Sequence, residues 1–522
     1  MILLNIIKNA FIFLKKNLTK ILNLTSKKQK MPTEPIIKYF ESNLKIVNDF
    51  TIPKTLKITG GANFWNAKEM QILKEQSRLK INLQFVDSDK QYYNDVSDRK
   101  IEAYELSNDS YKYYVPKKAT HMRSFNPTNG ELDEKFNFTF LGEIDQLGTV
   151  RDLTEFNGKF HRLLIPFNSS ELILKDFQKW YFTSDVKSNN KTLIKIEFEE
   201  LKFHLFNFSL GKQQYWGIDS LQALDFEKFK SIAYSALNVY GFIKGNLYLR
   251  EAYYFVSENT NFITEYFHYS LIRDNIETGY QIFTTNPYSV YVPHNHDKGQ
   301  RLDTGKVNKW NSKLLNFSEE NFSKLVEYFY KHETLSRSAL IILEANTQPL
   351  ELKAASYCVA YEGICHTIKK LIDINAPSSI DQIVWEQNIK PEFEKLLSSL
   401  KKNGLLDDNQ DRILSSKINN LNQPTNRDSL TAPFLKLGYN LNQLEIKCID
   451  NRNKFLHGSL PVKSNDEDEN FKELYLNSIT IHKLIYILIL KLIGFEGYII
   501  NYPKLHEQTT GKPIKEELLI KI

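Results

Sequence analysis

Three neighbouring side chains could carry out acid–base and phosphate chemistry together: Arg452, Asn453 and His457. A histidine titrates near neutral pH, so it can accept or give a proton as a general base or acid. An arginine stays charged and presents a planar fork of N–H donors that matches two phosphate oxygens. An asparagine amide can orient either group or hold a further oxygen. The stretch "CIDNRNKFLHG" (448–458) is therefore a candidate active site or half of one.

The same stretch also has a purely structural interpretation, as the end of an amphipathic helix. Gly458 is suited to end the helix in a left-handed turn, and basic groups near a helix C-terminus gain about 0.3–1 kcal/mol from its dipole. At about 100° per residue, Asn453 and His457 point about 40° apart, whereas Arg452 and His457 point about 140° apart. One regular helix therefore does not aim the arginine and the histidine at one small target.

Arg452 also has possible partners within the chain. Leu444, Cys448 and Arg452 form one stripe of the predicted helix, and Glu445 and Ile449 lead to Asn453 in the same way. Arg452 could form an ion pair equally with Glu445 or with Glu362. A structural arginine and a functional one both remain possible at this point.

The other candidate sites are weaker. His294, His296 and Asp297 in "PHNHDKG" could be metal ligands because alternate strand residues face the same way, but no distant partner completes the set. Cys358 and Cys365 share a helix face, where burial as small apolar residues explains them better than a metal. The chain has no Walker-type loop, no C-x-x-C pair and no G-x-S-x-G motif. We therefore predict neither a metal site nor a cofactor.

The elements that must position the candidate site differ between the two halves of the chain. From about residue 35 to 310, apolar and polar residues mostly alternate, which is typical of half-buried strands. The Glu199-Glu200 pair interrupts one alternating run, as a bulge or tight turn would, and one helix is predicted over 225–242. The predicted strands span residues 135–144, 160–167, 194–198, 201–205, 246–256 and 279–285. This half is predicted to be a sandwich or a bent sheet.

From about residue 317 the pattern becomes helical. In the segment 349–374, Leu352, Ala355 and Val359 form one apolar stripe and the cysteines form another, so this helix is expected to be buried between neighbours. The segment 479–495 is almost wholly apolar but is short and interrupted by lysine, which favours the central helix of a bundle over a membrane span. The predicted helices span residues 316–345, 349–374, 391–404, 441–458 and 479–495, and the acidic run 464–470 is predicted to be a solvated loop.

Length and composition limit the protein class. A chain of 522 residues is long enough for two or three domains, and 42% hydrophobic residues exclude a disordered protein. Three cysteines cannot form a disulfide framework and suit a reducing cytoplasm. The net charge of +6 comes from residues 1–30, whose seven lysines and absence of acids leave the remainder at −1. A basic surface for nucleic acid is therefore not predicted, and any nucleic acid must bind at a local site.

The first thirty residues have three interpretations. They lack the apolar run of a secretory signal and are too interrupted to span a bilayer. Their apolar residues fall on helical spacing between lysines, as in a cationic helix on a membrane surface. Alternatively, translation starts at Met31 and the leader is a mis-called extension. Membrane attachment is not expected.

The opening motif acquires a specific meaning through a family resemblance. Arg452-Asn453-Lys454-Phe455-Leu456-His457 resembles the R-x4-6-H signature of HEPN domains (higher eukaryote and prokaryote nucleotide-binding), in the subtype with a polar residue after the arginine. The segment 417–441 together with "IDNRNKFLHG" is similar to the HEPN domain of the ApeA type, which follows a long β-rich domain. The resemblance covers about residues 330–500 by motif and context.

This resemblance implies a fold, an activity and partners. The implied fold class is α+β, with a large β-rich N-terminal domain followed by an all-α HEPN-like bundle. The implied activity is metal-independent cleavage of RNA in anti-phage defence, through a site that two chains form together, with Arg452, Asn453 and His457 as catalytic residues. Apart from the resemblance, Glu362 is a structural or electrostatic partner expected for Arg452 and is not expected to be catalytic. The implied setting is a cytoplasmic homodimer, triggered by a phage-derived or cellular signal at the N-terminal domain. An alternative is a non-catalytic dimerisation bundle with a ligand- or protein-binding sensor domain. The predicted division of the chain is 1–30, 31–315, 316–500 and a tail at 501–522.

Overall fold

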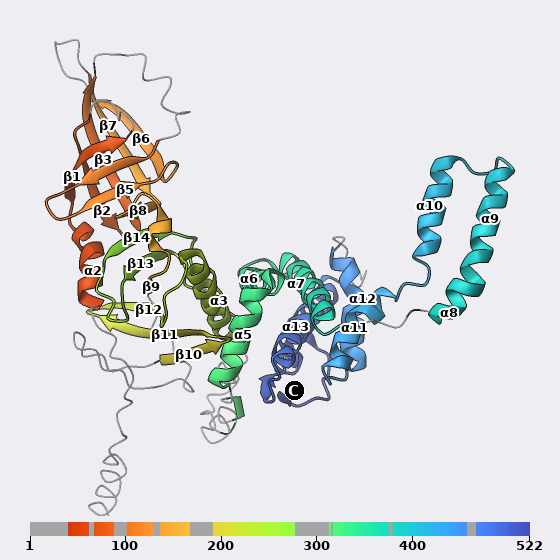
Figure 1. Cartoon of the computed structure of the whole chain (residues 1–522). Coiled ribbons are helices and arrows are strands. Elements are labelled where there is room, and N and C mark those ends of the chain that lie inside the picture. Colours follow the sequence, from red (N-terminus) through yellow and green to blue (C-terminus); the bar gives the residue numbers. More distant parts are fainter. Residues whose placement is uncertain are drawn as a thin grey trace, which may run out of the picture.

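The chain folds into a sheet-rich N-terminal part and a helical C-terminal part (Figure 1), which confirms the predicted α+β class. The structure is a computed structural model. It describes residues 40–61, 67–87, 102–128, 136–167, 192–276, 309, 313–314, 317–374, 378, 380–456 and 466–522.

The strands of the N-terminal part form one continuous antiparallel sheet. Among the described residues the sheet has fourteen strands in the order β10-β11-β12-β9-β13-β14-β8-β5-β4-β1-β2-β3-β7-β6. The strands span Lys54–Gly61 (β1), Glu69–Glu75 (β2), Arg78–Asp87 (β3), Tyr104–Ser107 (β4), Lys112–Val115 (β5), Thr120–Thr128 (β6), Phe136–Ile144 (β7), Gln146–Gly148 (β8), Phe160–Phe167 (β9), Thr192–Phe198 (β10), Leu201–Leu210 (β11), Gln213–Ser220 (β12), Glu251–Ser257 (β13) and Tyr266–Leu271 (β14).

Several predicted strands agree with this sheet. The predictions at 135–144 and 160–167 are confirmed as β7 and β9. Glu199-Glu200 is a tight turn between β10 and β11, in which Glu199 has a φ of 52° and Phe198 pairs with Leu201. The strand predicted at 246–256 begins later, at Glu251. The strand predicted at 279–285 lies outside the described residues.

The two faces of the sheet contribute to two separate cores. One face packs against helix α2 (Phe40–Asn48), with Phe40 and Leu44 fully buried. The other packs against helix α3 (Phe226–Lys244), whose buried residues repeat at the predicted helical spacing. Helix α3 ends at Gly245, whose φ of 81° is the left-handed conformation that glycine adopts easily. The sheet is thus covered on one side by a short helix and on the other by a long one.

The helical part comes after β14 in the chain and packs beside α3. Its helices span Glu319–Lys331 (α5), Glu333–Ala345 (α6), Leu350–Leu371 (α7), Gln382–Val384 (α8), Trp385–Ile389 (η6, a π-helical turn), Lys390–Lys402 (α9), Asp408–Asn419 (α10), Asn426–Lys436 (α11), Gln443–Leu456 (α12) and Glu467–Leu492 (α13). The chain continues through the short elements Tyr498–Ile500 (β15), Tyr502–Leu505 (α14), Glu507–Thr510 (α15) and Leu519–Lys521 (β16), and β15 pairs with β16. The region predicted as a tail therefore contains regular structure.

Helix α13 is the buried central helix that the sequence predicted. Among the described residues it alone is long and apolar enough to cross a membrane, and its apolar window lies entirely inside the protein. The helix begins earlier than predicted, so residues 467–470 of the acidic run were wrongly assigned to a loop. Glu467, Asp468 and Glu469 form its first turn, where the helix dipole favours negative charge, and the Asp466 side chain accepts from the Asp468 N–H.

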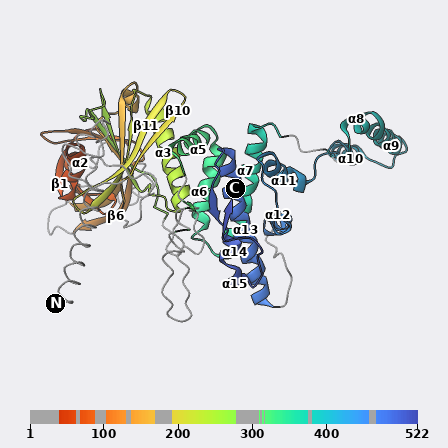
Figure 2. The same cartoon turned by 90° about the horizontal axis from the view of Figure 1, so that it is seen from below.

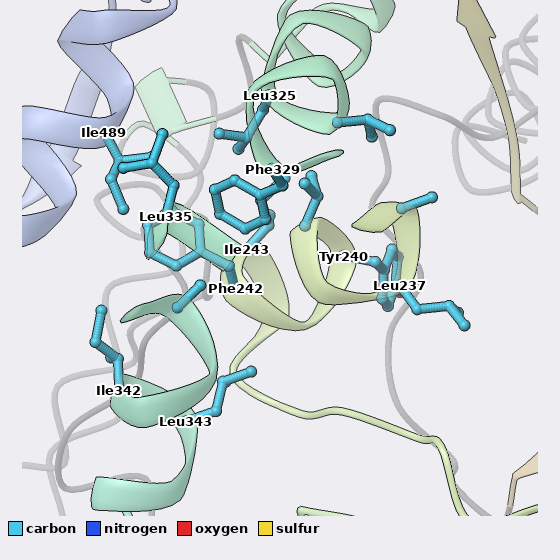
Figure 3. Close-up of a cluster of buried hydrophobic side chains, with 14 of the residues drawn as sticks. Leu237, Tyr240, Phe242, Ile243, Leu325, Phe329, Leu335, Ile342, Leu343 and Ile489 are labelled. Carbon is cyan, nitrogen blue, oxygen red and sulfur yellow. The ribbon is translucent and has the colours of Figure 1, made fainter. Parts of the chain in front are cut away.

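One hydrophobic core joins the sheet to the helical part (Figure 3). Side chains of α3, α5, α6 and α13 meet there, including Phe242, Phe329, Leu335 and Ile489. The rings of Phe242 and Tyr486 stack with their centroids 4.2 Å apart, and the Tyr486 hydroxyl donates to the Phe242 carbonyl at 2.6 Å. The two parts of the chain are therefore packed as one body.

Helices α9 and α10 form a hairpin that projects away from the other helices (Figures 1 and 2). A separate small core holds the hairpin together, with Trp385, Leu397 and Ile418 buried in it. This hairpin has no share in the main core described above.

Candidate functional site

Helix α12 carries the candidate motif and is fixed at its start by reciprocal hydrogen bonds. The Asn442 side chain accepts from the Glu445 N–H at 2.9 Å, and the Glu445 carboxylate accepts from the Asn442 N–H at 2.9 Å. This exchange satisfies backbone donors that a helix start leaves open. Cys448, Ile449 and Phe455 then bury one face of α12 in the main core. The buried face determines which way the motif residues point.

Arg452 lies inside the protein and only part of its donor capacity is used. Its side chain is 2% exposed. The Nε–H donates to Oε1 of Glu362 on α7 at 2.8 Å, and Nη1 donates to the Ile449 carbonyl at 3.0 Å. Its Nη2 is buried and has no hydrogen-bond partner among the described residues. A buried N–H without an acceptor destabilises a fold by about 1–3 kcal/mol, so this nitrogen calls for an explanation.

The structure decides between the two possible partners of Arg452. Glu445 forms an ion pair with Lys483 of α13 instead, at 2.6 Å, and both side chains are at most 1% exposed. The Tyr439 hydroxyl donates to the same carboxylate at 2.8 Å. Glu445 is thus fully engaged elsewhere, and the expected support of Arg452 by Glu362 is confirmed.

The remaining motif residues differ in how far the structure places them. Asn453 is exposed on the surface of α12, next to the buried Arg452. Its neighbour Asn451 is buried and donates to Asn477 of α13 at 3.2 Å, so Asn451 has a structural role. His457 lies outside the described residues. The arginine and the asparagine are therefore placed, and the position of the histidine stays a prediction.

The face of α7 next to Glu362 is more exposed than predicted. Leu352 is 58% exposed and Val359 is 50% exposed, so the stripe expected to be buried is partly open to solvent. The periodicity correctly identified the stripe, but it could not show that no element among the described residues fully covers Leu352 and Val359. The second stripe, with Cys358 and Cys365, is buried as predicted. An exposed apolar stripe therefore runs along the helix that holds Arg452 in place.

The cysteines have the properties of core residues. All three are buried, and burial raises the pKa of each thiol, Cys358, Cys365 and Cys448, to about 12. A thiol with such a pKa is a poor nucleophile and a poor metal ligand near neutral pH. Within the described part of the chain no group of three or more His, Cys, Asp or Glu could hold a metal ion. The histidine cluster His294, His296 and Asp297 lies outside that part.

The structure contains two buried ionic clusters that were not predicted from the sequence. In the bundle, Lys483 lies between Glu445 and Glu516, whose Oε2 is 3.4 Å from its Nζ. In the sheet, Arg162 of β9 forms a bidentate ion pair with Asp219 of β12, at 2.7 and 2.8 Å. In both cases the sequence signal of a buried ion pair was a charged residue, Arg162 or Lys483, beside a long apolar run. The acidic partners could not be identified from the sequence, because they lie 57 and 38 residues away and only the fold brings them close.

Comparisons with known proteins give no independent information about the site. No family model matches the chain, and neither the curated proteins nor the solved structures contain a match.

Proposed function

We propose that the protein is a metal-independent endoribonuclease of the HEPN class, with α12 contributing half of a site that two chains complete. The observation that carries the proposal is the state of Arg452. Glu362 and the Ile449 carbonyl fix two of its nitrogens, while Nη2 lacks an acceptor among the described residues. A phosphate oxygen is an acceptor that would satisfy this donor. The motif then supplies a histidine five residues further on.

The chemistry requires three tasks that these residue types can perform. A base removes the proton of the ribose 2′-hydroxyl, whose oxygen attacks the adjacent phosphorus. The bond from phosphorus to the 5′-oxygen breaks, and an acid returns a proton to that oxygen. Two His457 residues, one from each chain, would serve as base and acid. Arg452 would stabilise the negative charge that grows on the phosphate oxygens, and Asn453 would orient a phosphate or the histidine.

A homodimer is part of the proposal because one helix does not bring the motif residues together. A two-fold axis would place the same surface of both chains in contact, so each motif would face its copy. The exposed Leu352 and Val359 lie on α7, whose Glu362 pairs with Arg452, and they are an apolar surface that a second chain would cover. In this scheme the sheet receives a phage-derived or cellular trigger in the cytoplasm, and no membrane is involved.

A second function is a non-catalytic dimerisation bundle with a sensor domain. The burial of Arg452 and its ion pair with Glu362 favour this alternative, because both stabilise the packing of α12 against α7. Under this alternative the missing acceptor of Nη2 would be a group at a protein interface. The two functions therefore differ in whether RNA is cleaved.

The test is RNA cleavage by the purified protein in EDTA. We expect His457→Ala and Arg452→Lys each to lower the cleavage rate by about 100-fold or more, the range of a lost general acid–base or charge-stabilising group. His366→Ala is the matched control because His366 is an exposed histidine of α7 outside the motif, and it should cleave at the wild-type rate. Equal cleavage by all variants would refute the nuclease. If the wild type needs its trigger, toxicity on overexpression that His457→Ala abolishes is the equivalent readout.

A further inference from the structure

The projecting hairpin of α9 and α10 exposes an unusual share of apolar side chains. Among the described residues, sixteen large apolar side chains are exposed, and seven of them lie between residues 383 and 421. These seven are Ile383, Val384, Phe393, Leu396, Leu405, Ile413 and Leu421. A segment that stands apart from the main core therefore holds nearly half of the exposed large apolar residues.

Part of this apolar surface forms one face of the hairpin. At about 100° per residue, positions 393, 396 and 400 lie within about 60° of one another on α9, on one side of the contact residue Leu397. Ile413 lies about 140° from Ile418 around α10, in the same rotational sense as those α9 positions are turned from Leu397, so it lies at the outer edge of that side. In two antiparallel helices, flanks turned in the same sense lie on the same face. Phe393 (38% exposed), Leu396 (55%) and Ile413 (43%) therefore share a face.

The hairpin cannot cover this face by itself. Two helices share a single line of contact, and here the buried apolar residues are Leu397 of α9, Ile418 of α10 and Trp385 of the turn η6 before α9. Antiparallel helices of this kind ordinarily complete a core as four-helix bundles, in which two hairpins pack face to face. The face formed by Phe393, Leu396 and Ile413 is therefore apolar and uncovered, as one half of a four-helix bundle core would be.

Charges near the turn of the hairpin fix the level of its two helices and indicate which orientation a second hairpin would take. Lys401 forms ion pairs with Asp408 and Asp411, which aligns the two helices and places Glu392 of α9 at about the level of Lys417 of α10. A two-fold axis parallel to the hairpin would lay α9 of one chain against α10 of the other. Each Glu392 would then approach the Lys417 of the other copy. All neighbouring helices would run antiparallel, which is the favourable arrangement of their dipoles.

We infer that this face binds a second copy of the chain, and that the two hairpins form a four-helix bundle around a two-fold axis along their length. Phe393, Leu396, Leu400 and Ile413 of both copies form the new core, with two Glu392–Lys417 pairs at one end. The pairing does not depend on the chemistry of α12, so it stands or falls separately from the proposed nuclease.

Site-specific cross-linking of the full chain tests the predicted neighbours. A mixture of Leu396→Cys and Ile413→Cys proteins, treated with a short bis-maleimide, should give at least fivefold more covalent dimer than either protein alone. The native cysteines do not compete, because all three are buried. Leu435→Cys on α11 replaces Ile413→Cys in the matched control, since Leu435 is 64% exposed on another helix. As much dimer in the control mixture, or none in the test mixture, would overturn the inference.

A charge exchange tests the orientation independently. Glu392→Lys or Lys417→Glu alone should weaken self-association through the hairpin by roughly tenfold in sedimentation, because each creates two like-charge contacts. The double variant should return to within about twofold of the wild type. If the double variant is no better than the single ones, the proposed orientation is wrong, and capture of a different protein by the face would likewise overturn the pairing.

Discussion

Two buried arginines, one in the sheet and one in the bundle, have very different surroundings. Arg162 is fully buried and is held by a bidentate ion pair with Asp219, by the Asn43 amide oxygen at 3.0 Å, and by the rings of Phe40 and Phe262. Arg452 is nearly as buried but has one carboxylate contact, one carbonyl contact and an Nη2 without an acceptor in the described part of the chain.

The difference separates a structural arginine from a candidate functional one. Asn43 also donates to the Phe262 carbonyl at 3.0 Å, so the polar groups around Arg162 link helix α2 to the sheet. Around Arg452, the partner Glu362 has a side chain that is 39% exposed, and the neighbouring Asn453 faces solvent. Proteins usually satisfy buried donors completely, and an incompletely satisfied charged group is more often found where a ligand binds.

Among the variants proposed here, we expect Arg162→Met to lower the stability of the fold most. Arg162→Met would leave the Asp219 carboxylate, which is 2% exposed, buried without its partner. We expect the free energy of unfolding to fall by about 3–5 kcal/mol, the usual effect of breaking a buried ion pair from one side. Urea unfolding followed by circular dichroism measures it. A loss no larger than that of the matched Arg452→Met variant would contradict the comparison.

Acid should weaken both regions, because each contains a buried histidine. Burial lowers the pKa of His482 in α13 to about 3 and that of His268 in β14 to about 4. At pH 5 the unfolded chain binds protons at these histidines, with an ordinary pKa of about 6.5, whereas the folded chain does not. Stability is therefore complete above about pH 6.5 and is lost as the pH falls toward the folded pKa values.

We expect each histidine to account for about 2 kcal/mol of lost stability between pH 7 and pH 5. His482→Phe and His268→Phe should each reduce the pH dependence of urea unfolding by about that amount. Because His482 lies in the bundle and His268 in the sheet, the two variants compare the acid sensitivity of the two regions. An unchanged slope in either variant would show that the histidine is already protonated or solvated in the folded state.

Arg452→Met should affect stability less than Arg162→Met. The Glu362 carboxylate left behind is accessible to water, and the unsatisfied Nη2 is removed with the arginine. We expect the free energy of unfolding to fall by about 1 kcal/mol. RNA cleavage by the same protein should be abolished under the proposed function. A stability loss as large as that of Arg162→Met would indicate that Arg452, like Arg162, mainly stabilises the fold.

The smallest effect is a change in the salt dependence of RNA binding, expected for Glu362→Gln. Glutamine preserves the acceptor for the Arg452 Nε–H but removes the negative charge beside it. The site gains one positive charge, which should steepen the salt dependence of RNA affinity by about one unit on a double logarithmic plot. Filter binding at several salt concentrations measures the slope. An unchanged slope would mean that RNA does not approach this carboxylate.

Much of the local structure could be predicted because it depends on nearby residues. The Glu199-Glu200 turn broke a visible alternation, and the burial of helix α13 followed from its almost wholly apolar segment. The acidic run was misplaced because acidic residues favour both loops and first turns of helices, and local composition does not separate the two. The stripe of Leu352 and Val359 was recognised, but whether a neighbour covers it depends on the arrangement of whole helices.

The candidate site was only partly predictable for the same reason. Arg452 and Glu362 are 90 residues apart in sequence, so spacing alone left Glu445 equally plausible. The buried position of Arg162 was not foreseen, because strand alternation shows which residues share a face but not that helix α2 covers it. The roles of Asn453 and His457 remain predictions that cleavage measurements can test.

The core that α3 shares with α5, α6 and α13 has a mechanical consequence. Phe242 stacks on Tyr486 and accepts a hydrogen bond from the same side chain through its carbonyl, so in the described residues the helix that covers the sheet is packed directly on α13. A rigid rotation of one part against the other would have to break this packing. Under the proposed function, a signal received by the sheet would therefore reach α12 through small shifts in side-chain packing along α13. It would not require a rigid-body rotation of one domain against the other.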